Sequence, residues 1–310
     1  MIWVVVKIGN NKPERQHHVP KVYLRNFVAE DDSIAVCDVR RGKIFTTGLE
    51  AVGVEKNFYT LEKLDDPYCW EKFYATGIEP FMADTFSRVC SKCNLFVLNR
   101  TPVIDAELKS ALALIMTVQF FRGKHCRKYE WNIYKRELPS VERKVRKIRG
   151  RLTPEEEDFL QKFKQDDFFF KRSAMEASTD PKRMIQFTEF LVRRQFVVYR
   201  ILGEGEFVTS DQPVMFANFQ TGNVKPFTNG LIKPETIIFF PLTPKLLCCA
   251  FHSDSVFSKF GEKDGAIIDL DAKAENGFLH SVNKKQSEQC YSQVYSRSEA
   301  TLQSLFGKRK

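Results

Sequence analysis

The sequence lacks any long apolar run. Residues 1–9 are apolar but short, and no window approaches the roughly 20 residues that a membrane-spanning helix needs. The same segment lacks the basic leader and the small-residue cleavage site of a secretory signal. We therefore expect a cytoplasmic protein that makes no use of a membrane.

Several catalytic motifs are also missing. The sequence contains no G-x-x-x-x-G-K-[ST] or G-x-G-x-x-G phosphate loop, no G-x-S-x-G elbow and no H-E-x-x-H helix. These motifs place glycines, a nucleophile or metal ligands at a spacing that their chemistry requires. Their absence leaves a nucleoside triphosphatase, a dinucleotide-dependent enzyme or a typical serine hydrolase without support.

Cysteine is present but follows no framework. Eight cysteines are scattered along the chain, and only Cys90 and Cys93 form a C-x-x-C pair. A zinc site would need a second ligand pair with similar spacing, and none exists. The sequence predicts reduced thiols rather than disulfides or a structural metal.

The composition is that of a globular protein with a real core. The chain has 310 residues, of which 43% are hydrophobic and 28% charged. Short β-rich runs come first, helical periodicity fills 104–194, and β-rich runs return over 195–270. This order predicts a single α+β domain over 1–310, whose helical middle region packs on a mostly antiparallel sheet built from N- and C-terminal segments.

Proline and glycine mark the expected limits of the helices. A helix is predicted from Asp66 to about Arg88, and Pro80 should kink or break it. The strongest helical segment runs from Asp105 to about Leu138, apolar nearly all round at first and basic later. Gly123 is its weak point, and Pro139 is expected to end it.

Positive charge is in excess, with a formal net charge of +9. A basic balance favours a polyanion partner such as nucleic acid. Cations interleaved with Tyr129, Trp131 and Tyr134 suit phosphate contact plus base stacking, although a solvated helix face has the same pattern. The predicted nucleic-acid-binding residues are Lys124, Arg127, Lys128, Arg143, Arg146, Lys147 and Arg149.

Two adjacent histidines precede a helix start at Pro20. His17 and His18 are two of only five histidines, and an imidazole at such a junction can be a general acid or base, or a metal ligand. The alternative is a polar loop with a capping histidine.

Gln119 and Arg122 share one face of the apolar helix. A guanidinium there needs a carboxylate partner or a bound phosphate. Glu79 is the natural partner for a structural ion pair, and it can otherwise carry a raised pKa or hold a metal.

Asp211 lies in Thr209-Ser210-Asp211-Gln212-Pro213, at the end of a predicted strand. Such a position suits a cleft residue, a base or a metal ligand. An Asx turn explains it equally well.

Short motifs spread over 14–298 resemble the bacterial domain of unknown function 4238 family. They are Gln16-His17-x-x-Pro20-x-x-Tyr23-Leu24-Arg25-Asn26-Phe27, Asn57-Phe-Tyr-Thr60, Ile78-Glu79, Gln119-x-x-Arg122, Thr209-Ser210-Asp211-x-Pro213, Pro241-Leu242-x-Pro244, and, more weakly, Asn283 with Val294-Tyr295-Ser296. The family tends to continue Gln-x-x-Arg with Thr-Pro, where this chain has Gly123-Lys124. The resemblance selects His17 over His18.

The resemblance implies that distant polar residues meet at one site. The candidate catalytic residues are His17, Glu79, Gln119, Arg122 and Asp211. Two hypotheses follow. The first is a nuclease-like phosphodiester hydrolase, metal-dependent or histidine-based, acting in host defence or as a toxin, with Glu79 and Asp211 as candidate ligands of Mg²⁺ or Mn²⁺. The second is a non-catalytic nucleic-acid-binding or sensing protein with a structural polar core. A protein–protein module is a weaker third.

Overall fold

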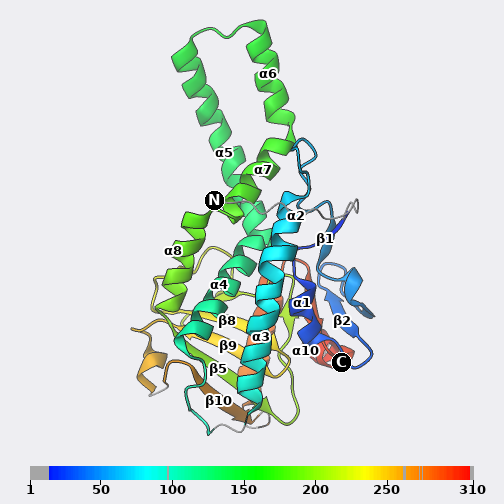
Figure 1. Cartoon of the computed structure of the whole chain (residues 1–310), viewed down its shortest axis with the longest axis vertical. Coiled ribbons are helices and arrows are strands. Elements are labelled where there is room, and N and C mark those ends of the chain that lie inside the picture. Colours follow the sequence, from blue (N-terminus) through cyan, green and yellow to red (C-terminus); the bar gives the residue numbers. More distant parts are fainter. Residues whose placement is uncertain (1–13, 96–97, 261–262, 272, 274, 308–310) are drawn as a thin grey trace.

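The computed structural model describes residues 14–95, 98–260, 263–271, 273 and 275–307 (Figure 1). The strands are β1 (Arg15–His17), β2 (Ser33–Asp38), β3 (Lys43–Gly48), β4 (Val54–Lys56), β5 (Gln195–Leu202), β6 (Thr209–Ser210), β7 (Met215–Asn218), β8 (Thr236–Thr243), β9 (Leu246–Phe251), β10 (Ala266–Asp271) and β11 (Gln293–Ser296). The α-helices are α1 (Lys21–Leu24), α2 (Cys69–Phe73), α3 (Glu79–Asn94), α4 (Ala106–Arg122), α5 (Lys124–Arg149), α6 (Pro154–Gln165), α7 (Asp167–Ser178), α8 (Pro181–Val192), α9 (Asn276–Gln289) and α10 (Glu299–Phe306). Short 3₁₀ turns cover Arg25–Phe27, Leu49–Ala51 and Val256–Phe260. The predicted α+β class is confirmed.

The larger sheet has the strand order β10-β5-β9-β8-β7 and comes entirely from the C-terminal half. Its neighbours are antiparallel except for the parallel pair β10 and β5. Alternate residues of β9 enter different cores: Cys248 packs with the helices of the first half of the chain, and Cys249 packs with Leu279 and Val282 of α9. Because both faces are covered, β9 is apolar throughout.

A second sheet joins the two ends of the chain. Its order is β3-β2-β11-β6, all antiparallel, and α10 packs against β2 and β3. A separate small ladder pairs β1 with β4. The predicted sheet is therefore two principal sheets, and only the smaller combines N- and C-terminal strands.

Helices α3 and α4 lie over one face of the larger sheet (Figure 1). As predicted, α4 is buried around most of its circumference. Asp105 caps it by accepting a hydrogen bond from the backbone N–H of Leu108. No helix among the described residues is long and apolar enough to span a membrane, and all eight cysteines are free thiols.

The three residues predicted to disturb the helices have different outcomes in the structure. Gly123 divides the expected long helix into α4 and α5, because its extended backbone interrupts the turn. Pro139 does not end α5, which continues to Arg149 and accepts the loss of one backbone hydrogen bond. Pro80 is accommodated in the first turn of α3, after a π-helical turn over Tyr74–Ile78, where a missing N–H costs little.

Beyond the body of the protein, the outer part of α5 and helix α6 form a projecting two-helix arm (Figure 1). Its connection is set by a capping box in which Thr153 and Glu156 satisfy each other's backbone N–H groups. At the base of the arm, α5 packs on α7. The start of α5 consequently lies in the body, and its end lies far from it.

Candidate functional site

A buried guanidinium organises the polar residues around β1. Arg122, the last residue of α4, is 2% exposed. Its Nε donates to Tyr59 Oη at 2.7 Å, and its Nη2 donates to the His17 carbonyl at 2.5 Å and to Glu79 Oε1 at 3.0 Å. The guanidinium also lies 4.3 Å from the ring centroid of Tyr74. The ion pair with Glu79 that the sequence offered as the structural alternative is therefore present.

Arg122 remains charged in this environment. Burial alone lowers its pKa, but the neighbouring oxygens of Tyr59 and Glu79 outweigh burial and raise the pKa above its ordinary value. Burying a cation is costly unless it is paired and hydrogen-bonded, and here Nε and Nη2 have partners whereas Nη1 has none. Arg122 thus ties β1, the Tyr59 segment and α3 to the end of α4.

Gln16, at the head of the opening motif, anchors the same segment. Its Oε1 accepts from the backbone N–H of Tyr59 at 2.5 Å, and its Nε2 donates to Thr60 Oγ1 at 2.9 Å. On the α4 side, Gln119 Nε2 lies 3.4 Å from the carbonyl of His18, while Gln119 Oε1 has no hydrogen-bond partner. The segment from Gln16 to His18 therefore forms its hydrogen bonds largely through the Gln16 side-chain amide and the carbonyls of the two histidines.

Both histidines are held neutral. His17 is 8% exposed, and its Nε2 has no hydrogen-bond partner. Burial lowers the pKa of His17 to about 4, and the cations Lys21 and Arg122 act in the same direction. Burial also holds the pKa of His18 well below its ordinary value.

The buried His17 leads to a testable pH dependence. Between its folded pKa of about 4 and its ordinary pKa of 6.5, the unfolded chain binds a proton that the folded protein does not. Stability therefore rises with pH across this window, and the His17 penalty vanishes above it. From pH 7 to pH 5, we expect the unfolding free energy of the parent to fall by about 2 kcal/mol more than that of His17→Gln. Urea denaturation at both pH values measures this difference, and an equal fall in the two proteins would contradict it.

Sequence reasoning missed Glu71, which belongs beside these residues. Burial raises the pKa of Glu71 to about 7, Arg122 opposes this shift and Glu79 adds to it. Its Oε2 has no hydrogen-bond partner. Between pH 4.5 and about pH 7, stability falls as pH rises because of Glu71, which is opposite to the effect of His17. Both the parent and His17→Gln contain Glu71, so its effect cancels when the two proteins are compared. The available signal was its position about two helical turns before Glu79.

Asp211 lies apart from this network. Its carboxylate accepts from the backbone N–H groups of Tyr291 (2.7 Å), Ser292 (2.7 Å) and Gln293 (3.1 Å), and from Ser292 Oγ (2.8 Å). Burial raises its pKa, although these hydrogen bonds act against that shift. In the part of the chain that the structure describes, no hydrogen bond or ion pair joins it to His17, Glu79, Gln119 or Arg122. Asp211 therefore fixes the backbone at the start of β11.

The candidate metal ligands are held by other protein groups. Glu79 is paired with Arg122, and both carboxylate oxygens of Asp211 accept hydrogen bonds. Across the described ranges, no group of three or more His, Cys, Asp or Glu side chains is placed to hold a metal ion.

The predicted nucleic-acid residues separate into two groups. Lys124, Arg127 and Lys128 line one surface pocket of about 400 Å³, whose other lining residues are Glu55, Phe58, Trp131, Asn132 and Tyr291. Lys124 pairs with Glu55 at 2.7 Å, and the guanidinium of Arg127 lies 4.2 Å from the Phe58 ring centroid. We call this the basic aromatic pocket.

The remaining cations lie on the arm. Arg143, Lys147 and Arg149 are exposed near its far end. Arg146 is engaged by carboxylates, with Nη2 donating to Glu142 at 3.0 Å and to Glu157 at 2.9 Å. These arm cations therefore form a solvated face, and they do not line the basic aromatic pocket.

A family model described as "Protein of unknown function (DUF4238)" matches residues 15–300 of the chain. The chain belongs to the DUF4238 family. The matched range of this DUF4238 protein includes both the Arg122 network and the basic aromatic pocket. Searches of curated proteins and of solved structures gave no match.

Proposed function

We propose that this DUF4238 protein binds single-stranded nucleic acid in the basic aromatic pocket, without cleaving it. The observation that carries the proposal is that three cationic side chains and the rings of Phe58, Trp131 and Tyr291 line one cavity. Strand-binding proteins combine these two elements, because cations contact phosphates and every base has a face that can stack.

The individual side chains suit different parts of a strand. Lys128 is exposed, and its Nζ lies 5.9 Å from the Tyr291 ring centroid, so it can reach a phosphate beside a stacked base. Lys124 lies 5.7 Å from the same centroid and is balanced by Glu55. A phosphate would compete with Glu55 for this lysine, which favours a polyanion over a single anion.

The Arg122 network supports the pocket from behind. Arg127 donates to the Phe58 carbonyl, and the adjacent Tyr59 accepts from Arg122 Nε. Lys124, the first residue of α5, follows Arg122 by two positions. The polar residues that define the family resemblance are therefore positioning residues, and their proposed role is to fix the Phe58 wall and the start of α5.

Labelled single-stranded RNA and DNA, and the matching duplexes, test the proposal in filter-binding and gel assays with and without Mg²⁺ or Mn²⁺. We expect single strands to bind more tightly than duplexes, and their affinity to fall as the salt concentration rises. The labelled strand should keep its full length. Equal affinity for both forms, or no binding at low salt, would contradict the proposal.

A phosphodiester hydrolase is the second candidate, and unpartnered polar atoms around Arg122 favour it. His17 Nε2, Glu71 Oε2 and Arg122 Nη1 are all buried without a hydrogen-bond partner. A neutral imidazole can accept a proton, a carboxyl with a pKa of about 7 can donate one, and a guanidinium can stabilise a phosphate. Under this candidate, the protein would cleave the labelled strand, and His17→Ala or Glu71→Gln would abolish cleavage with little change in melting temperature. Cleavage that survives both substitutions would rule these roles out.

A further inference from the structure

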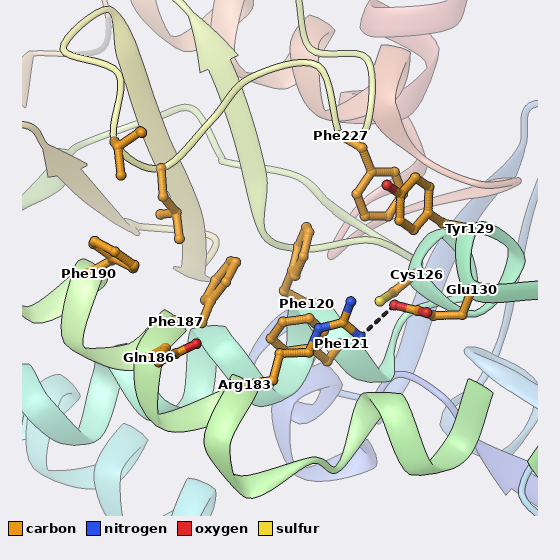
Figure 2. A pocket seen from close by; sticks show the side chains of 12 residues that line it. Phe120, Phe121, Cys126, Tyr129, Glu130, Arg183, Gln186, Phe187, Phe190 and Phe227 are labelled. Atoms are coloured by element: carbon orange, nitrogen blue, oxygen red, sulfur yellow. Dashed lines mark ion pairs between the residues drawn. The ribbon is translucent and has the colours of Figure 1, made fainter. Parts of the chain in front are cut away.

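A second group of cavities lies on the other side of α5 from the basic aromatic pocket. One, of about 340 Å³, is shown in Figure 2, and an adjoining one has about 280 Å³. They share walls from the end of α4, from α5 and α8, and from the loop between β7 and β8. The shared residues are Phe120, Tyr129, Phe187, Phe227 and Leu231.

The shared walls are aromatic rings held in stacked pairs. Phe120 and Phe187 stack with centroids 5.1 Å apart and planes 17° apart, and Tyr129 and Phe227 stack at 4.3 Å and 23°. Figure 2 shows both pairs around the opening. Tyr129 and Phe227 are each 41% exposed. Partly exposed aromatic rings of this kind at a cavity favour a flat aromatic ligand.

Phe227 is held in an unusual backbone conformation. Its φ is +62°, in the left-handed region that bulky residues seldom adopt. Its ring is held against Tyr129 and 5.7 Å from the Phe120 centroid. A strained residue kept at a cavity mouth is a common feature of ligand clamps.

The smaller cavity carries an unused hydrogen-bond acceptor. Gln212 lines it and is 2% exposed, yet its Oε1 has no hydrogen-bond partner. Asn229 also lines it, and its Nδ2 donates to the carbonyls of Phe216 and Asn223, which leaves Oδ1 as an acceptor. A buried acceptor without a donor is costly, so a ligand N–H would be stabilised there.

The charge of the smaller cavity restricts the ligand further. Among the described residues that line it, none is Asp, Glu, Lys or Arg. Burial lowers the pKa of His125, and its Nε2 lies 2.9 Å from the Gln289 carbonyl, so it donates to that oxygen as a neutral ring. The cavity is therefore suited to a neutral group rather than to a phosphate or a carboxylate.

Gly123 makes room for this acceptor. A Cβ at position 123 would lie 2.2 Å from Gln212 Oε1. The resemblance leads to the expectation of Thr at this position, and a threonine would displace the glutamine side chain. The departure of this chain from the family pattern thus leaves free the space beside position 123 that Gln212 Oε1 occupies.

We propose that the smaller cavity binds a neutral planar heterocycle with N–H donors, namely a nucleobase, between its aromatic walls and against Gln212. The base can be that of a free nucleoside or an unpaired base of a strand. This site does not depend on the proposed strand binding at the basic aromatic pocket, because the two cavities have different walls and different charge.

Isothermal titration calorimetry of the intact protein with adenosine, cytidine, guanosine and uridine tests the proposal. We expect at least one nucleoside to bind saturably, and Gln212→Met to weaken that binding by roughly ten-fold through loss of one hydrogen bond. Gly123→Ala should weaken it similarly by moving Gln212. Lys128→Glu, in the other pocket, is the matched control and should leave nucleoside affinity unchanged. Melting curves confirm that each variant is folded.

A second set of measurements distinguishes a free nucleoside from a base of a bound strand. A strand whose affinity falls in Gln212→Met, with no free nucleoside bound, assigns the site to a base of a bound strand. Binding of adenosine but not of N6,N6-dimethyladenosine, which lacks the amino hydrogens, supports the hydrogen bond to Gln212. If neither nucleosides nor strands respond to Gln212→Met and Gly123→Ala, or if only an apolar dye binds, the proposal is wrong.

Discussion

The double variant Lys124→Glu with Lys128→Glu is expected to bind single strands about a hundred-fold more weakly at low salt, because it reverses the charge of both lysines in the basic aromatic pocket. Both side chains line the same cavity, and Lys128 is exposed to a ligand. Each phosphate contact also releases counterions, so the slope of log affinity against log salt should become shallower by roughly 1.4 for the two contacts. Filter binding at several salt concentrations measures affinity and slope together.

The arm supplies the matched control for this experiment. Arg143→Glu with Arg149→Glu changes the net charge by the same amount, at exposed positions in the outer part of α5, which projects from the body of the protein (Figure 1). A general charge effect would weaken binding equally in both double variants, whereas a contact effect would be confined to the pocket. A larger loss from the arm variant would move the interface there and contradict the proposed site.

The second large effect is expected at Arg122. Arg122→Met should lower the unfolding free energy by about 3–5 kcal/mol, the range typical of breaking a buried ion pair by removing one partner. The substitution removes the donor to the Tyr59 hydroxyl, the closer of two donors to the His17 carbonyl, and the cation that pairs with Glu79. Urea denaturation at pH 7 measures the loss, and strand binding should fall in parallel because the Phe58 wall depends on this network.

Glu79→Gln is the control for Arg122→Met. The Glu79 side chain is 26% exposed, and glutamine keeps an oxygen that can accept from Arg122, so we expect a loss of about 1 kcal/mol. If Arg122→Met left stability unchanged and removed a cleavage activity, Arg122 would act on substrate and the positioning role would be wrong.

The fold class could be predicted because it depends on short-range pattern. Periodicity identified the apolar α4, and the β-rich runs after Gln195 supply the larger sheet as well as β6 of the smaller one. Single breakers were harder to interpret: Pro139 lies inside a helix, and Gly123 separates two. Whether a helix continues past such a residue depends on the packing around it, which is not a local property.

The candidate site was predictable in part. The pairing of Glu79 with Arg122 was anticipated because a guanidinium on an apolar helix needs a carboxylate. Glu71 was not, because its only signal in the sequence is the spacing of about two helical turns to Glu79, and that spacing does not show which of the helix's side chains become buried. Asp211 was predicted to belong to the same site because it lies at the end of a predicted strand. Its carboxylate instead accepts hydrogen bonds from backbone N–H groups around Ser292.

The sequence by itself determined the class of fold, the basic character, the reduced cysteines and the residues that needed a polar partner, since each follows from composition or from spacing within one element. Only the tertiary structure decided which partners they found. It separated the pocket lysines from the arm, joined Phe58 to α5, and brought Gln212 beside Gly123. These contacts link residues tens of positions apart, and their geometry is set by the packing of whole helices and sheets rather than by local propensity.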